Sequence, residues 1–292
     1  MKRITFILAM VFTNSTIFAQ VDTTQKQSTA DTIRIGGMVI IKKDDPNQNR
    51  RNTTVTIGRR NNNKSSNVST AQWIFDLGFA NWIDKTDYTG ATSQSYIVNR
   101  PGSPTLGEND FKLRSGKSVN VNIWIFMQRL NLIQHYVNLK YGLGVELNNY
   151  RFKTPVSFKE AGPNPYTGQN ISHPFVFRDS ISFKKNKLAA DYVTIPFMLN
   201  YRTNPNSSHK GISLSAGVSV GYLYSSRNKQ ISEERGKHKN RGDYDVEKWK
   251  FAYIGELGLG PARLYGSYSP KSVFENGFKM MPYNVGIRFS NW

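Results

Sequence analysis

The sequence contains no cysteine, and it has no apolar run long enough to form a membrane helix. The lack of cysteine excludes disulfides, a thiol nucleophile, Cys-X-X-Cys metal sites and the acylated cysteine of a lipoprotein. A membrane helix needs about 20 apolar residues, whereas the apolar run at residues 4–12 is far shorter. With only four histidines as well, the chain offers little material for general acid–base catalysis.

What the sequence has instead is a set of short segments in which apolar and polar residues alternate. In residues 191–201, the odd positions from Val193 to Tyr201 are apolar or aromatic, whereas the even positions include Thr194, Pro196 and Asn200. Period two is typical of a β-strand with different surroundings on its two faces, and about ten tilted residues span a bilayer. The alternation occurs in eight segments: residues 71–79, 118–128, 137–148, 191–201, 212–222, 251–259, 262–268 and 283–289.

The polar faces of these segments are too poor in charge for a surface in contact with water. A water-facing surface carries charge at about a quarter to a third of its positions, but here Gly, Ser, Asn and Thr dominate. A soluble barrel would turn the aliphatic faces inward; sparse, balanced charge instead suits the closed interior of a narrow membrane barrel. In this phasing Ala71 and Met127 face lipid, whereas Gln72, Phe126 and Gln128 face the lumen. We predict a structural network of lumen charges: Asp76, Lys140, Glu146, Glu256, Arg263 and Arg288.

The connections between the segments alternate strictly between long and short. The long ones are residues 84–117, 149–187, 224–248 and 269–280, and the short ones are residues 129–134, 203–210 and 260–261. Outer-membrane barrels pair long external loops with short periplasmic turns, and their strands must close because hydrocarbon does not tolerate an open sheet edge. Residues 71–292 therefore predict an all-β fold: an eight-stranded, antiparallel, up-and-down transmembrane β-barrel with both termini in the periplasm.

The amino-terminal segment predicts export. Lys2 and Arg3 precede the apolar run at residues 4–12, and Ala19 ends a cleavage site before Gln20, so residues 1–19 read as a signal peptide. The alternative, a membrane anchor, would need a longer apolar run. Residues 20–70 are rich in Asn, Thr, Lys and Arg, which indicates a mostly disordered, basic periplasmic linker. Within it, residues 33–42 predict a small hairpin around Gly36-Gly37.

One strand also resembles a known family. The run Tyr192-Val193-Thr194-Ile195-Pro196-Phe197-Met198-Leu199-Asn200-Tyr201-Arg202 resembles the strand Y-[LV]-x-I-P-[LF]-[LM]-L-x-Y of the PorT-like outer-membrane β-barrel family. Residues 141–146, 217–221 and 255–261 support the resemblance, which covers residues 71–292. It implies an eight-stranded barrel in the outer membrane of a Gram-negative bacterium, and some relatives are accessory parts of a protein secretion system. The long basic segment after the signal peptide and the long loops depart from the family pattern.

Pro196 and the final segment are unusual among these strands. Pro196 cannot donate a hydrogen bond to a neighbouring strand, so we expect a bulge or an irregular pair there. The final segment resembles the aromatic-ended strand that the outer-membrane assembly machinery recognises; its in-phase aromatic residue is Phe289, with Trp292 out of step.

The net charge is +19, and the second and third long connections each carry seven Lys and Arg residues. On an external surface this charge would contact lipopolysaccharide phosphates or an acidic partner; the alternative is a solvated loop matched to its own membrane. No specific nucleic-acid partner is expected for an exported barrel. The candidate anion contacts are Arg151, Lys153, Lys184, Lys185, Lys187, Lys237 and Lys239.

We therefore expect a non-enzymatic integral outer-membrane protein with a structural, interaction or secretion-accessory role and no cofactor or metal. Its expected partners are outer-membrane lipid and lipopolysaccharide, the assembly machinery, and a secretion-system or other envelope protein. One alternative is a lipid-A-modifying enzyme, but the histidines show no Ser/His/acid or metal-ligand spacing. The second is a surface adhesin, because Arg241-Gly242-Asp243 is the tripeptide of integrin-binding adhesins. The histidines are His135, His173, His209 and His238.

Overall fold

The computed structural model describes residues 31–35, 38–42, 66–205 and 211–290, and the chain divides into two units, residues 1–65 and 66–292. In the first unit, β1 (Asp31–Ile35) and β2 (Met38–Lys42) form an antiparallel hairpin in which Ile35 pairs with Met38. The predicted signal peptide and most of the predicted basic linker lie outside the described residues. In the described part of the chain, no helix is long and apolar enough to cross a membrane.

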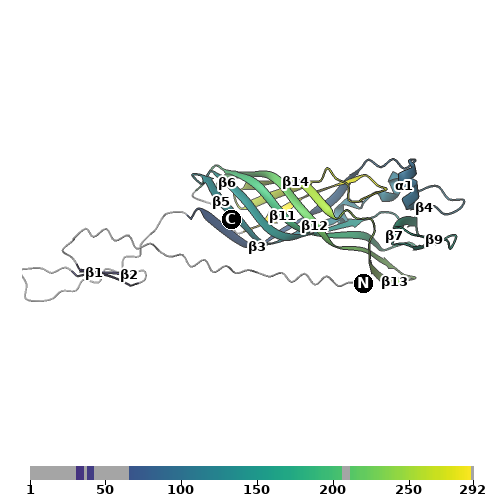
Figure 1. Cartoon of the computed structure of the whole chain (residues 1–292), viewed down its shortest axis with the longest axis horizontal. Helices are drawn as coiled ribbons and strands as arrows, with labels where there is room; N and C mark the ends of the chain where they lie inside the picture. Colours follow the sequence, from purple (N-terminus) through teal and green to yellow (C-terminus); the bar gives the residue numbers. More distant parts are fainter. Residues whose placement is uncertain (1–30, 36–37, 43–65, 206–210, 291–292) are drawn as a thin grey trace, which may run out of the picture. The chain divides into compact units, whose positions relative to one another are not determined.

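The second unit is built around a closed ring of eight antiparallel strands, which confirms the predicted fold class (Figure 1). Each strand pairs with its neighbours in the chain, the last strand pairs with the first, and the β11–β12 pairing completes the ring. The strands are β3 (Val68–Asp84), β5 (Val119–Ile133), β6 (Val137–Arg151), β11 (Lys185–Arg202), β12 (Ile212–Ser232), β14 (Trp249–Leu259), β15 (Ala262–Tyr268) and β16 (Met280–Phe289).

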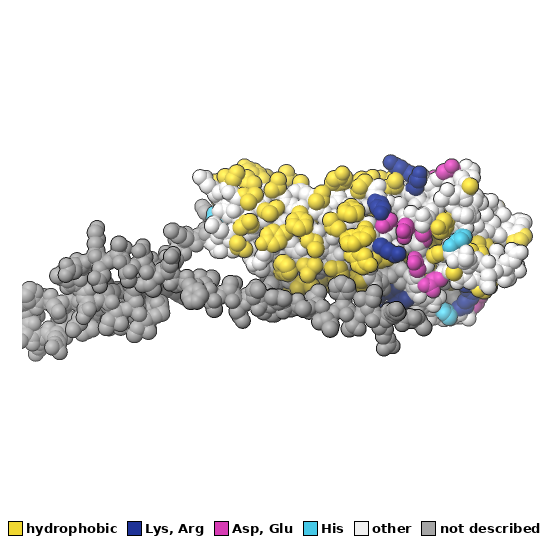
Figure 2. Space-filling model, in the orientation of Figure 1, with side chains coloured by type: hydrophobic (Ala, Val, Ile, Leu, Met, Phe, Trp, Pro, Cys, Tyr) yellow, Lys and Arg dark blue, Asp and Glu magenta, His cyan; other side chains and the backbone are white. Residues whose placement is uncertain are grey.

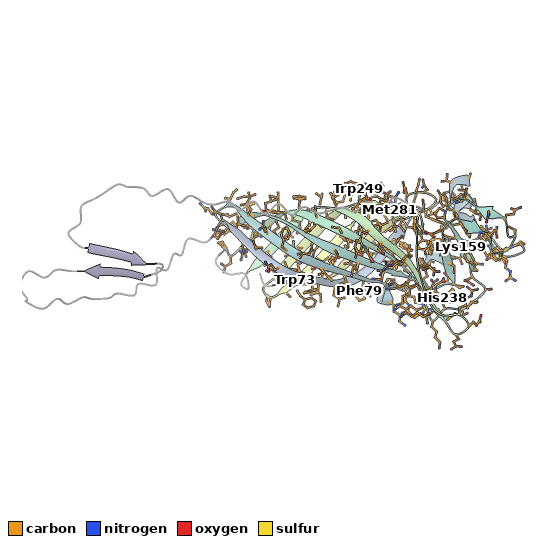
Figure 3. The ribbon with its side chains drawn as sticks, turned by 60° about the horizontal axis from the view of Figure 1, so that its bottom comes forward. Trp73, Phe79, Lys159, His238, Trp249 and Met281 are labelled. Atoms are coloured by element: carbon orange, nitrogen blue, oxygen red, sulfur yellow. The ribbon has the colours of Figure 1, made fainter. Side chains whose placement is uncertain are left out.

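The two faces of the barrel wall carry opposite chemistry. Leu199, Leu214 and Val285 are more than half exposed on the outside, and apolar side chains form a band across the visible face of the barrel (Figure 2). Trp73, Phe79 and Trp249 point outward within this band (Figure 3). Polar side chains such as Asn120 and Ser215 are buried on the inside. The aliphatic face is therefore the one that meets hydrocarbon, as the alternation predicted.

Part of the predicted phasing is wrong in β3 and β5. Ala71 and Met127 are buried, whereas Gln72 is exposed and Gln128 donates to Thr70 outside the lumen. The cause is a local irregularity: Trp73 has a positive φ of 55°, and the pairing of β5 with β6 shifts by one residue between Trp124 and Phe126. A one-residue shift moves every following side chain to the other face.

This irregularity creates a small apolar plug inside the otherwise polar lumen. Beyond the shift, Phe126 is no longer fully buried, contrary to its predicted lumen position. Apolar side chains from three strands pack together instead: Ala71, Ile74, Trp124, Met127 and Met198.

Pro196 is accommodated without a bulge. The pairing of β11 with β6 skips Ile195 and Pro196 but keeps the same register on both sides, so the expected irregular pair is present. The bulge of β11 against β12 lies instead between Asp191 and Tyr192. The proline therefore interrupts the pairing between β11 and β6 locally but leaves the alternation of β11 intact.

The long connections are not open loops but fold together as a cap at one end of the barrel (Figure 1). We use the name cap for residues 85–118, 152–184, 233–248 and 269–279. Its elements are α1 (Ala91–Tyr96), β4 (Ile97–Val98), η1 (Glu108–Phe111), η2 (Ser115–Lys117), β7 (Val156–Lys159), β8 (Gly162–Pro163), β9 (Asn170–Ile171), β10 (Phe175–Arg178) and β13 (Gly236–Arg241).

Aromatic residues form the core of the cap. The rings of Phe111 and Phe278 lie 5.0 Å apart, and those of Phe158 and Phe274 lie 5.9 Å apart in a stacked arrangement. Trp82, near the carboxyl end of β3, contacts this cluster, and its ring centroid lies 6.5 Å from that of Phe274. The cap core is therefore continuous with the inside of the barrel and covers that mouth of the lumen.

Candidate functional site

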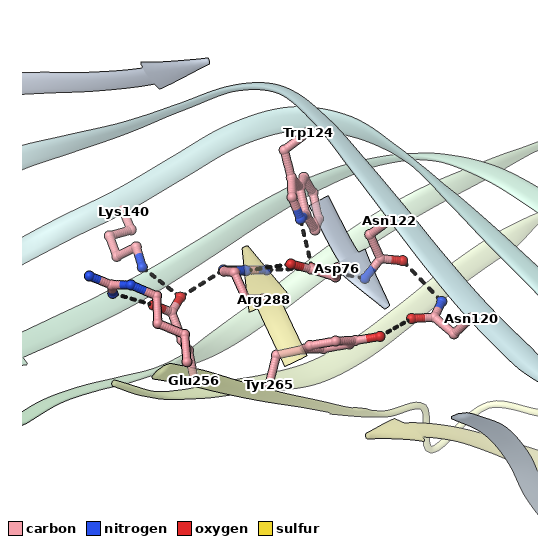
Figure 4. A network of polar contacts seen from close by, with 9 residues as sticks. Asp76, Asn120, Asn122, Trp124, Lys140, Glu256, Tyr265 and Arg288 are labelled. Carbon is pink, nitrogen blue, oxygen red and sulfur yellow. Dashed lines mark hydrogen bonds and ion pairs between the residues drawn. The ribbon is translucent and has the colours of Figure 1, made fainter. Parts of the chain in front are cut away.

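The centre of the lumen is a carboxylate surrounded by three cations (Figure 4). Glu256 accepts from Lys140 Nζ at 2.6 Å, from Arg263 Nη1 at 3.0 Å and from Arg288 Nη1 at 2.7 Å. All four side chains are at least nine-tenths buried. The strand periodicity brings them together because each occupies an inward position of a different strand.

Arg288 also binds Asp76 at two points. Its Nε lies 2.7 Å from Oδ1 and its Nη2 lies 2.8 Å from Oδ2. Trp124 Nε1 and Asn122 Nδ2 donate to the same carboxylate at 2.8 and 3.1 Å. These ion pairs and hydrogen bonds offset the free-energy cost of removing the charged groups from water.

Glu146, the sixth predicted lumen charge, is joined to this network through amides. Asn148 donates to Glu146 at 3.1 Å and accepts from Asn120 at 3.0 Å. Asn120 in turn donates to Asn122, which donates to Asp76. A continuous chain of buried polar groups therefore runs along the lumen.

The ionic partner of Glu146 was missed by the sequence analysis. Lys250 forms a buried ion pair with Glu146, but it precedes the segment in which we recognised the alternation, at residues 251–259. The described β14 begins at Trp249, and a polar residue in phase with Ala252 and Ile254 was the available signal. The lumen lined by Thr194, Glu146 and Arg288 leaves a cavity of only about 20 Å³. The ion pairs stabilise a closed wall around this part of the lumen.

The histidines do not gather into a site. His135 lies in the turn between β5 and β6 with a positive φ, the His173 ring lies 5.1 Å from that of Tyr96 in the cap, and His238 lies on the exposed strand β13 (Figure 3). His209 lies outside the described residues. Among the residues that the structure describes, no group of three or more His, Asp or Glu side chains could hold a metal ion.

A second candidate site lies where four strands extend beyond the apolar band. There β6, β11, β12 and β13 form one sheet, and four basic residues stand opposite one another in register: Arg151, Lys187, Lys229 and Lys239. Opposite residues share one face of a sheet, and the neighbouring Asn186, Leu188 and Asn228 are buried on the other face. Lys185 and Lys237 pair with Ile231 in the next row. We call Arg151, Lys185, Lys187, Lys229, Lys237 and Lys239 the basic face.

The basic face collects five of the seven predicted anion contacts. Lys184 instead pairs with Glu233 at 2.7 Å on the surface, and Lys153 lies in the cap connection. Lys229 was not predicted, because the cross-strand register that aligns it cannot be read from the sequence. Burial, together with the neighbouring charges of Lys185 and Lys229, lowers the pKa of Lys187 to about 8. The site is thus strongly cationic and includes a lysine close to losing its proton.

Comparison with known proteins identifies the family. Residues 62–270 match the family model described as outer membrane protein beta-barrel domain. Solved structures with similarity include Ail, the attachment invasion locus protein of Yersinia pestis, in complex with the heparin analogue sucrose octasulfate, at 13% identity over 75% of this chain and 99% of that chain, with a TM-score of 0.29. A porin of Rhodopseudomonas blastica shows 9% identity over 76% and 99%, with a TM-score of 0.16. No match was found among curated proteins. Because the family model spans most of the ring of strands and the cap, the chain belongs to the outer membrane protein beta-barrel domain family and is an outer-membrane β-barrel protein.

Proposed function

We propose that this protein is a non-enzymatic interaction protein whose cap faces the cell exterior and whose basic face holds anionic groups of the cell surface. The orientation is supported by the alternation of connections, since long loops are typical of the external side and short turns of the periplasmic side. It requires export by the amino-terminal signal and places both ends of the barrel domain in the periplasm.

The filled lumen supports a role at the surface. Glu256 and Asp76 are engaged by buried cations, and the aromatic rings of the cap cover one mouth. A barrel of eight strands has an interior that side chains fill. Recognition of a partner therefore falls to the cap and to the strand ends that carry it.

The observation that carries the proposal is the row of four cations on neighbouring strands. Like charges directly opposite each other destabilise a sheet, yet Arg151, Lys187, Lys229 and Lys239 are aligned in this way. Phosphate or carboxylate groups of a polymeric partner would relieve this repulsion. Lipopolysaccharide and acidic surface polysaccharide both present such groups at this level.

The other roles considered from the sequence have less support. The strand that resembles the PorT-like family, residues 191–201, lies in the barrel wall between lipid and lumen, so it supports the fold and leaves partner choice, including any secretion-accessory role, to the cap. In the adhesin tripeptide, Gly242 N–H donates to Ser226 O and Asp243 N–H donates to Glu160. These bonds hold the tripeptide against the strand rather than at a free loop tip.

Retention on phosphocellulose tests the proposal. The triple variant Lys187→Gln, Lys229→Gln and Lys239→Gln should elute at much lower salt than the wild type. The control triple variant Lys112→Gln, Arg114→Gln and Lys117→Gln removes the same charge from exposed cap positions and should elute close to the wild type. Equal losses in both variants would mean that net charge alone causes retention, and the basic face would have no special role.

A further inference from the structure

A cleft opens where β12 changes its pairing partner. Tyr222 pairs with Trp249 of β14, whereas Arg227 pairs with Arg241 of β13. Between them the register of β12 against β11 shifts by one residue, because Asp191 pairs with Ser225 and Tyr192 pairs with Leu223. The extra residue, Tyr224, and the split between β13 and β14 leave a cleft of about 670 Å³.

Asp191 contributes a buried acceptor to this cleft. The residue lines the cleft and is only 2% exposed. Its Oδ2 pairs with Arg227, but Oδ1 has no hydrogen-bond partner among the described residues. A buried carboxylate oxygen without a donor is unfavourable. The atom is therefore matched to a ligand that brings a hydroxyl or an N–H group.

Cations and aromatic rings complete the lining. Arg241 and Lys248 are exposed at the cleft, whereas Arg227 is partly buried and paired with Asp191; the acidic lining residues are Asp191 and Asp243. Guanidinium and ammonium groups bind phosphate by charge-assisted hydrogen bonds. Tyr222 and Tyr224 are about half exposed and offer flat surfaces for a sugar ring.

The level of the cleft relative to the membrane favours a lipid as its ligand. Tyr222 packs edge-on against Trp249 at 4.9 Å, and Trp249 lies at the cap-side end of the apolar band (Figure 3). Tyr and Trp are enriched where a membrane meets water. A ligand in this cleft therefore has its polar part at headgroup level, with the apolar band directly beneath it.

We propose that this cleft binds the phosphorylated sugar headgroup of a lipopolysaccharide molecule in the outer leaflet. A sugar hydroxyl or amide donates to Asp191 Oδ1, a phosphate accepts from Arg241 and Lys248, and a sugar ring packs on Tyr222 and Tyr224. The site rests on the outward orientation of the cap proposed above, but it uses residues other than those of the basic face. It would fix one lipid where β12 changes its pairing partner from β14 to β13.

Native mass spectrometry of the full chain in detergent micelles tests the site with diphosphoryl lipid A as the probe. The variant Arg241→Gln with Lys248→Gln should bind it about tenfold more weakly than the wild type, since it loses two charge-assisted contacts. Tyr224→Leu, which keeps every charge, should also weaken binding. Fully dephosphorylated lipid A should bind the wild type and the double variant equally. Heat-modifiable gel mobility establishes that each variant is folded.

Three outcomes would overturn the site. They are unchanged binding of diphosphoryl lipid A to the folded double variant, equally tight binding of glucosamine 1-phosphate, which lacks acyl chains, and loss of lipid A binding in the basic-face triple variant but not in the cleft variants. The last result would still support anion binding by the basic face. The opposite result is also possible: the basic-face triple variant is retained normally on phosphocellulose, and lipid A binding is lost only in the cleft variants. That result would overturn the proposed function but still support the cleft site.

Discussion

Arg288 and Asp76 are 212 positions apart in the chain, yet they stand directly opposite each other and form a two-point ion pair. Arg288 lies on the last strand of the barrel and Asp76 on the first. The pair therefore lies where the first and last strands close the ring, and both side chains are buried. It joins the closure of the fold to the lumen network, because Arg288 also binds Glu256.

Breaking this pair should strongly destabilise the barrel. Asp76→Ala leaves a buried guanidinium with only one of its two carboxylates, and loss of one partner of a buried pair costs about 3–5 kcal/mol. Urea unfolding in micelles, followed by gel mobility, measures the change. The matched control is Glu233→Gln, which removes an ion pair with Lys184 whose side chains are 77% and 68% exposed; it should change the unfolding free energy by less than about 1 kcal/mol. Similar losses of unfolding free energy in the two variants would show that the Arg288–Asp76 pair stabilises the barrel no more than a surface ion pair does.

The charged residues of the lumen could be predicted from the alternation of apolar and polar residues alone. Which side chains of a strand point inward depends only on the local sequence, and all six predicted charges are buried inside the barrel wall. Ala71 and Met127 were assigned to the wrong face because a positive φ at an ordinary residue such as Trp73 leaves no mark in the sequence. Backbone strain at one position then reverses the parity of everything beyond it.

The core of the cap and the cross-strand alignment of the basic face could not be predicted, for a different reason. Phe111, Phe158 and Phe278 come from three separate connections, and nothing local indicates that they meet. The row that includes Lys187 and Lys229 depends on cross-strand register, which is set by the bulge at Tyr224. The aromatic content of the connections was a usable signal, since solvated loops have little need for buried rings.

The lipid-facing side of the wall should show a depth-dependent response to charge. Val218 lies midway along the apolar part of β12, between Ile212 at one end and Tyr224 at the other. Val218→Arg should destabilise the folded barrel by about 2–4 kcal/mol, whereas Ile212→Arg, near the interface, should cost about 0–1 kcal/mol. Unfolding in lipid vesicles measures both. Equal costs at the two depths would contradict a hydrocarbon environment for this face.

The lumen should not conduct ions. The cavity beside Arg288 is only about 20 Å³, and aromatic residues cover the cap-side mouth, so the described part of the lumen leaves little space for water. Planar-bilayer recordings of the purified, folded protein should therefore show no discrete conductance steps, with a porin in the same lipid as the positive control. Reproducible single-channel steps that disappear on heat unfolding would mean that the lumen opens.

The pH dependence of anion binding should reveal the state of Lys187. Its pKa is lowered from 10.5 to about 8, so the basic face loses a positive charge as the pH rises through about 8, and retention on phosphocellulose should fall between pH 7 and 9. Lys187→Arg, whose guanidinium stays charged throughout this range, should remove that step.

Folding stability should move in the opposite direction over this range. Between about pH 8 and 10.5 the unfolded chain holds a proton at Lys187 that the folded chain has lost, and stability rises with pH wherever the unfolded state binds more protons. The wild type should therefore gain stability relative to Lys187→Arg as the pH rises through this window, while it loses phosphocellulose retention. If retention and stability fell together in the wild type, deprotonation would be disrupting the sheet itself, and the like-charge repulsion assigned to this row would be wrong.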